Sequence, residues 1–181
     1  AMAWSAKHAG PRFYWDWQRR QSTNQSAKFC GTPPLAHIAG LETAIALLEA
    51  EGLPQVWARH QRLAGAVHAA VERWAVPGAM RFHARLPETR SASVTAIEVA
   101  PGIDPEALRT VARERFQVAM AGGLGPLAGR VFRIGHLGDM NEPMILGALA
   151  GIEAAMTVQK IPFGTDGVAA AVAFLAAQST R

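Results

Sequence analysis

Residues 129–139 read GRVFRIGHLGD and predict a β-strand in which one charge stands among apolar side chains. Successive side chains of a strand point to opposite faces of its sheet. Phe132 and Ile134 therefore share one face, and Arg133 belongs to the other. Because an unpaired charge inside a protein costs several kcal/mol, the guanidinium of Arg133 needs an anion.

Two kinds of anion would satisfy Arg133. One is a structural Asp or Glu of the same fold, which would make Arg133 part of an internal ion pair. The other is the carboxylate of a small substrate, which the planar fork of an arginine binds with two hydrogen bonds. Gly135 removes bulk beside the guanidinium, which suits a substrate, but the pattern alone leaves both alternatives open.

The segments around this strand predict an α+β fold. Alternating patterns indicate further strands, and apolar spacings of three and four indicate helices that Asp104 and Asn141 can cap. We expect a small, mostly antiparallel sheet with helices packed on one face. The expected strands lie in 79–86, 93–100, 117–124 and 130–137, and the expected helices in 35–51, 54–74, 105–116, 142–158 and 167–177.

Composition excludes several classes of protein. The 18 basic residues are scattered, which argues against nucleic-acid binding despite a formal charge of +4. No apolar run reaches the roughly 20 residues that span a membrane. A single cysteine, Cys30, rules out an intrachain disulfide and fits the cytoplasm, where we expect the protein.

Two apparent motifs carry little weight. The segment 123–128, GLGPLA, matches a dinucleotide-binding fingerprint, but a strand follows it where that fingerprint needs a helix. Its glycines more simply allow tight turns. His136 and Asp139 suggest a metal site, yet no Cys or second His completes a ligand set, so we predict no metal and a hydrogen-bonded, structural His136.

Several segments, taken in order, resemble the class V pyridoxal-phosphate aminotransferases, above all the serine–glyoxylate and alanine–glyoxylate enzymes. The resemblance covers nearly the whole chain, and its most specific part is AGRVFRIGHLGD. The matching segments are FYWDW at 13–17, TPP at 32–34, LLEAEGLPQVWARHQRLAGAVHAAVERW at 47–74 and GGLGPLAGRVFRIGHLGDMNE at 122–142.

The resemblance implies roles for two residues. Arg133 matches the arginine that binds the substrate carboxylate, and Thr32 matches the threonine that reaches the cofactor phosphate of the neighbouring subunit. A tyrosine that often shares this task is replaced by Phe29. The resemblance places the lysine that forms the Schiff base in a domain ahead of this region, so we expect no catalytic residue here and interpret Lys7 and Lys28 as surface lysines.

The chain is thus expected to be the C-terminal half of a fold-type I enzyme that moves an amino group from serine or alanine to glyoxylate or a similar 2-oxo acid. Residues 1–52 would be the tail of the large cofactor domain, and 53–181 the small α+β domain with its connecting helix. Pyridoxal phosphate would serve the complete enzyme, a homodimer, without binding stably to this part alone. A separate chain could carry the cofactor domain. The alternative is a non-catalytic, self-associating interaction module, for which the aromatic cluster at 13–17 supplies an apolar surface.

Overall fold

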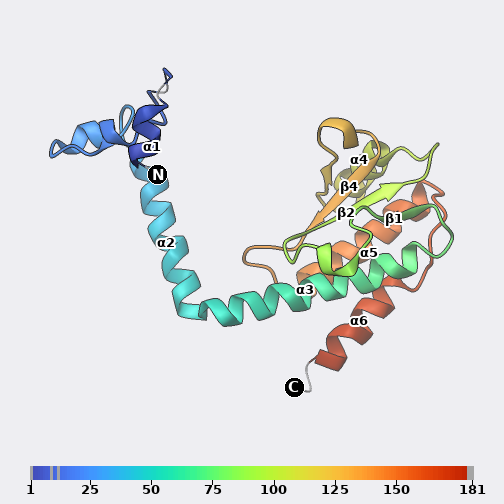
Figure 1. The fold of residues 1–181 in the computed structure, drawn as a ribbon. Helices are drawn as coiled ribbons and strands as arrows, with labels where there is room; N and C mark the ends of the chain where they lie inside the picture. The colour runs from blue at the N-terminus through green and yellow to red at the C-terminus, as the bar shows by residue number, and fades with distance from the viewer. Residues whose placement is uncertain (1, 9, 12, 179–181) are drawn as a thin grey trace. The chain divides into compact units, whose positions relative to one another are not determined.

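The computed structural model describes residues 2–8, 10–11 and 13–178, and it divides into two compact units (Figure 1). Unit 1 comprises Ala1–Gly52 and unit 2 comprises Leu53–Arg181. No helix in the described part of the chain combines the length and the apolar character needed to cross a membrane.

Unit 1 is a set of short helical segments followed by one long helix. The elements are α1 (Met2–Lys7), η1 (Gln18–Arg20), η2 (Gln25–Lys28) and α2 (Leu35–Glu51). Helix α2 ends where the sequence predicts, at Glu51, and the next residue is Gly52, whose φ of +87° is a conformation that favours glycine.

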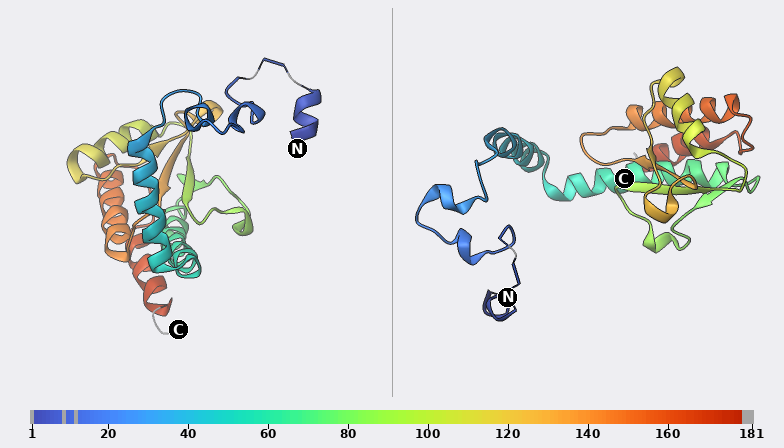
Figure 2. Two further views of the ribbon diagram at one scale, coloured as in Figure 1. Left: turned by 90° about the vertical axis from the view of Figure 1, so that its left-hand side faces the viewer. Right: turned by 90° about the horizontal axis from the view of Figure 1, so that it is seen from above.

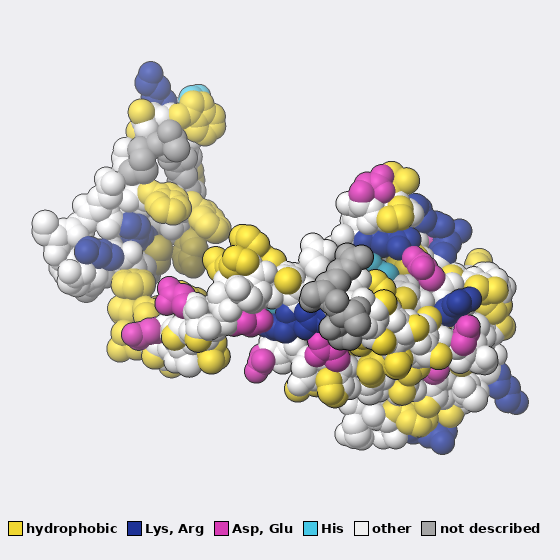
Figure 3. Space-filling view, turned by 90° about the horizontal axis from the view of Figure 1, so that it is seen from below, with side chains coloured by type: hydrophobic (Ala, Val, Ile, Leu, Met, Phe, Trp, Pro, Cys, Tyr) yellow, Lys and Arg dark blue, Asp and Glu magenta, His cyan; other side chains and the backbone are white. Residues whose placement is uncertain are grey.

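Apolar side chains of unit 1 are largely exposed. Helix α2 has no buried residue although leucine and isoleucine are frequent in it, and Leu35 is 71% exposed. The aromatic side chains that we expected to pack against something are also exposed; they are Phe13, Tyr14, Trp15 and Trp17. Figure 3 shows hydrophobic side chains of this kind in yellow on the molecular surface. No other part of the described chain therefore buries these apolar side chains, although burial would be favourable for them.

Unit 2 contains a four-stranded antiparallel sheet, as predicted. The strand order is β1-β2-β4-β3, and Figure 2 gives two further views of it. The strands are β1 (Met80–Phe82), β2 (Val94–Val99), β3 (Ala121–Gly122) and β4 (Val131–Gly135). The register sets Ile97 of β2 opposite Phe132 of β4, so both belong to one face of the sheet.

Four α-helices of unit 2 complete the α+β fold. They are α3 (Leu53–Trp74), α4 (Pro105–Phe116), α5 (Glu142–Val158) and α6 (Gly167–Gln178), with short 3-10 turns η3 (Pro87–Thr89) and η4 (Gly125–Leu127). Their apolar sides form one core with the sheet face that carries Ile97 and Phe132. The predicted fold class is confirmed.

The predicted helix caps are also present. The carboxylate of Asp104 accepts a hydrogen bond from the backbone N–H of Glu106 at 2.8 Å. The Asn141 side chain accepts one from the N–H of Met144 at 3.0 Å. Such caps satisfy donors that a helix leaves unpaired at its first turn.

Candidate functional site

Arg133 lies in the middle of β4, with small neighbours on both sides. Ala96 of β2 and Ala121 of β3 are its direct partners in the sheet. The Nε–H of the half-buried guanidinium donates to the carbonyl of Gly122 at 2.8 Å. Among the residues that the structure describes, no carboxylate lies within ion-pair distance of Arg133, so an internal ion pair does not account for this cation.

The nearest acidic residue on the same face of the sheet is engaged elsewhere. Glu98 lies opposite Val131, two positions along β4 from Arg133. Its carboxylate binds His83 Nδ1 at 2.8 Å and Arg81 Nε at 2.8 Å. These hydrogen bonds, first from His83 and then from Arg81, lower the pKa of Glu98 to about 2. Glu98 is therefore an anion that is already satisfied.

Helix α3 fixes the loop that follows β4, a feature that the sequence did not reveal to us. Arg59 donates from one terminal nitrogen to the carbonyls of Gly138 and Met140, at 2.8 and 2.9 Å. His60 accepts a hydrogen bond at Nε2 from the N–H of Gly138 at 3.0 Å. The partners are about 80 residues apart in sequence, so no local pattern could have indicated these contacts.

His136 is buried and fully bonded, which agrees with the structural role predicted for it. Its Nε2 lies 2.9 Å from the hydroxyl of Thr95, and its Nδ1 lies 3.1 Å from the carbonyl of Ala92. Burial is the main cause that lowers its pKa. Asp139 is exposed, and the described residues contain no group of three or more His, Cys, Asp or Glu able to hold a metal ion.

Thr32 lies in unit 1 and lines a shallow hollow that Arg20 also lines. The Arg20 guanidinium donates to the carbonyls of Phe13 and Phe29 at 2.8 and 3.1 Å, and it lies over the Phe13 ring at 4.9 Å. Thr32 itself is exposed on the lining of this hollow. Thr32 and Arg133 belong to different units.

The chain contains three lysines, which are the residues that could form a Schiff base with a cofactor. A lysine that forms a Schiff base needs a protected position, whereas Lys7, Lys28 and Lys160 are all exposed. Lys7 and Lys28 lie in the last turns of short helical segments, α1 and η2.

Comparisons with known proteins agree on one family. The family model described as aminotransferase class-V matches residues 12–129. The serine–glyoxylate aminotransferase of Methylorubrum extorquens is 40% identical over 166 residues, which cover 91% of this chain and 40% of that protein. The L-aspartate–glyoxylate aminotransferase of Paracoccus denitrificans is 42% identical over 141 residues, or 77% of this chain and 35% of that protein.

A solved structure supports the same conclusion. The pyridoxamine–pyruvate aminotransferase of Mesorhizobium loti superposes with a TM-score of 0.74 at 33% identity, over 81% of this chain and 37% of that one. The chain thus spans less than half the length of the relatives that it matches. The predicted fold family is confirmed as well: this α+β arrangement is part of the fold-type I aminotransferase architecture. The chain belongs to the class V aminotransferase family.

Proposed function

We propose that this chain is the substrate-binding, C-terminal part of a pyridoxal-phosphate-dependent aminotransferase that moves an amino group from serine or alanine to glyoxylate or a similar 2-oxo acid. The observation that carries the proposal is Arg133, a half-buried cation in the middle of β4 whose hydrogen-bond partner is a backbone carbonyl. The similarity to two glyoxylate aminotransferases supports the choice of acceptor.

In this proposal Arg133 binds and orients the substrate carboxylate. The bond from Nε to Gly122 fixes the plane of the guanidinium, and Ala96 and Ala121 leave room for an anion beside it. The terminal nitrogens then donate two parallel hydrogen bonds to the carboxylate. These two bonds fix the position and plane of the carboxylate next to Cα, which is the carbon that must lose its proton during amino transfer.

Thr32 takes the second role, as a hydroxyl donor to the cofactor phosphate of the neighbouring subunit in a homodimer. Phe29 cannot contribute a second hydroxyl at this hollow, although its backbone carbonyl helps to hold Arg20. The cofactor and its lysine would be supplied by a part of the protein outside this chain. We therefore propose that the chain alone neither retains pyridoxal phosphate nor transaminates, and that the complete enzyme acts in the cytoplasm.

A second candidate is a non-catalytic module that associates with itself. The exposed apolar side chains of α2, with Leu35 and Leu47 the most exposed, favour it because such surfaces are normally covered by another protein surface. In the first proposal a cofactor domain covers them, whereas in the second another copy of the chain does.

The test is an assay of the chain co-expressed with the cofactor domain of the Methylorubrum extorquens relative. We expect the purified complex to transfer the amino group of serine or alanine to glyoxylate, and the chain alone to show no turnover with added pyridoxal phosphate. Arg133→Lys should lower kcat/KM by about 100-fold, since the bidentate contact is lost. Arg115→Lys, at an exposed site on α4, is the matched control.

Three results would count against the proposal. Turnover by the chain alone would contradict the assignment of the lysine to another part of the protein. An unchanged kcat/KM in Arg133→Lys would remove Arg133 from the site. A stable oligomer of the chain that does not bind the cofactor domain would favour the interaction module, and sedimentation velocity distinguishes these states.

A further inference from the structure

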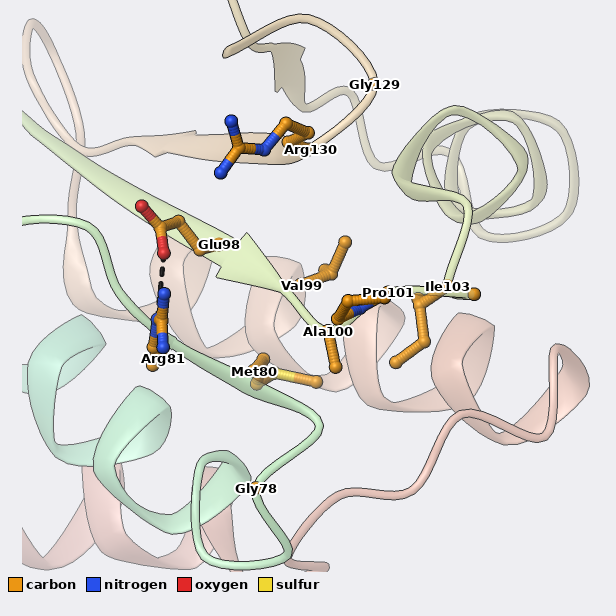
Figure 4. Close-up of a pocket in the computed structure, with 11 residues that line it drawn as sticks. Gly78, Met80, Arg81, Glu98, Val99, Ala100, Pro101, Ile103, Gly129 and Arg130 are labelled. Atoms are coloured by element: carbon orange, nitrogen blue, oxygen red, sulfur yellow. Dashed lines mark hydrogen bonds and ion pairs between the residues drawn. The ribbon is translucent and has the colours of Figure 1, made fainter.

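A hollow at the start of β4 is lined by three separate turns of the chain. Gly78 comes from the turn after α3, Pro101 from the turn after β2, and Gly129 and Arg130 from the turn before β4. The hollow, here named the Arg130 pocket, has a volume of about 560 Å³. Figure 4 shows the Arg130 side chain together with Arg81 and Glu98, which also line it.

Arginine side chains around the Arg130 pocket outnumber the acidic ones. Glu98 binds Arg81 at 2.8 Å and Arg85 at 3.2 Å, and its second oxygen lies 2.8 Å from His83. Arg130 adds a further guanidinium. Of the charged residues that line the pocket, two are arginines, Arg81 and Arg130, and one is a glutamate, Glu98, which leaves a formal excess of one positive charge.

Two of these guanidinium groups have donors to spare. The Arg130 side chain lines the pocket and has no hydrogen-bond or ion-pair partner within the described part of the chain, whereas its backbone bonds to Leu127 and Val99. Arg81 uses only its Nε to bind Glu98, which leaves its terminal nitrogens for another acceptor. Both oxygens of Glu98 already accept hydrogen bonds from other side chains, so Glu98 does not neutralise Arg130.

The remaining wall of the pocket is apolar. Met80 is buried, and Val99 and Ile103 are half-buried side chains that pack against the core. A hydrated inorganic ion gains little from such a wall, whereas a small molecule with an apolar body gains free energy by covering it. The site thus combines cationic groups with an apolar surface.

We propose that the Arg130 pocket binds a small organic carboxylate, with its carboxylate group on the Arg130 guanidinium and its apolar body against Val99 and Ile103. Arg133 is not among the lining residues. The proposal therefore does not depend on the role proposed for Arg133, and either can fail without the other.

The test is an NMR titration of the full ¹⁵N-labelled chain with sodium butyrate, sodium acetate and inorganic phosphate at constant ionic strength. We expect saturable shifts of the Gly78, Gly102 and Gly129 amides, with a dissociation constant for butyrate of about 1 mM to 10 mM. Acetate should bind about three- to tenfold more weakly, because it lacks two methylene groups that would cover the apolar wall. Phosphate should also bind more weakly than butyrate.

Matched variants identify the residues responsible. Arg130→Gln should weaken butyrate binding by at least about tenfold, since a charge-assisted hydrogen bond is lost. Its spectrum should otherwise match that of the parent, because Arg130 is exposed. Arg115→Gln on α4 should bind butyrate as the parent does. Absence of saturable shifts, or equal affinity in Arg130→Gln, would overturn the site. Equal affinity for acetate and butyrate, or tighter binding of phosphate, would overturn the proposed ligand class.

Discussion

The imidazole of His60 accepts a hydrogen bond at Nε2 from the backbone N–H of Gly138 at 3.0 Å, and this contact joins helix α3 to the loop after β4. The other ring nitrogen, Nδ1, lies 2.7 Å from the carbonyl of Val56. A carbonyl only accepts and an amide N–H only donates, so the two neighbours together require a neutral ring that carries its proton on Nδ1. His60 thereby fixes the segment through which the strand of Arg133 continues into α5.

Replacement of His60 by alanine should loosen this loop. The Gly138 amide would lose its acceptor, and the free energy of unfolding should fall by about 1–2 kcal/mol. Hydrogen–deuterium exchange measured by mass spectrometry should show faster exchange over 136–140, and urea denaturation gives the stability. His37→Ala, at an exposed position of α2, is the control. Unchanged exchange over this loop would show that Arg59 alone holds it.

Gly123→Ala should destabilise unit 2 much more than an ordinary glycine substitution. A Cβ at Gly123 would lie 2.0 Å from the carbonyl oxygen of Leu127, which is backbone and cannot move aside as a side chain can. We expect a loss of about 2–3 kcal/mol in urea denaturation. Gly147→Ala in α5 is the matched comparison: its Cβ would meet nothing within 4 Å, and the substitution should stabilise by about 0.5–1 kcal/mol. Equal effects of the two would contradict this interpretation.

Local sequence patterns predict the strands, the tight turns and the helix caps of unit 2. Alternation in 130–137 and 93–100 predicts strands because the side chains of a strand alternate between buried and exposed faces. The glycines of 123–128 are predicted to allow tight turns, and at Gly123 the physical cause is the Leu127 carbonyl, which leaves no room for a Cβ. Asp104 and Asn141 cap their helices through neighbours two and three residues away, which is why the sequence suffices to predict them.

Contacts between distant segments could not be predicted in this way. The bonds of Arg59 and His60 to Gly138 cross about 80 residues, and no periodicity records them. For Arg133 the sequence left two alternatives, an internal carboxylate or a ligand. Glu98 is the nearest acidic residue on that face of the sheet, and its carboxylate is bound to Arg81. The pairing of Glu98 with Arg81 follows from the register of β1, β2 and β4, which the sequence does not give.

Glu153 is another residue whose importance appears only in the fold, and its removal should be costly. One oxygen of Glu153 accepts hydrogen bonds from Trp74 Nε1 at 2.8 Å and from the Val168 N–H at 3.0 Å, and so links α3, α5 and the start of α6. Glu153→Ala leaves two donors without an acceptor and should lower the free energy of unfolding by about 2–3 kcal/mol. Glu153→Gln keeps an acceptor oxygen and should lose less free energy of unfolding than Glu153→Ala.

Glu114→Ala, on the exposed side of α4, is the control and should change the free energy of unfolding by no more than about 0.5 kcal/mol in the same urea series. A Glu153→Ala variant as stable as this control would contradict the link.

Two histidines, the buried His136 and the half-buried His68, should make the fold sensitive to mild acid. His68 and His136 lie with their ring centroids 6.2 Å apart, and His68 Nε2 is buried with no hydrogen-bond partner. Burial, then the charge of His136 and that of Arg90, lower the pKa of His68 from 6.5 to about 4. Between these values the unfolded chain binds a proton that the folded chain does not, so the contribution of His68 to stability is complete above pH 6.5 and is lost as the pH falls toward 4.

We therefore predict that the free energy of unfolding falls by about 2 kcal/mol between pH 7 and pH 5 through His68 alone, with a further loss from His136, whose pKa is also lowered. Glu98 and Glu142 have lowered pKa values too, but their contributions to stability are lost only below pH 4.5, outside this interval.

Urea denaturation at pH 7, 6 and 5 measures how the free energy of unfolding changes with pH. The His68→Leu variant has no group that titrates at this position. Its free energy of unfolding should therefore fall by about 2 kcal/mol less than that of the parent between pH 7 and pH 5, whatever its stability at pH 7. His37→Gln, at an exposed position of α2, is the control variant of the same series. A His68→Leu variant with the parental slope would show that His68 does not resist protonation in the folded protein.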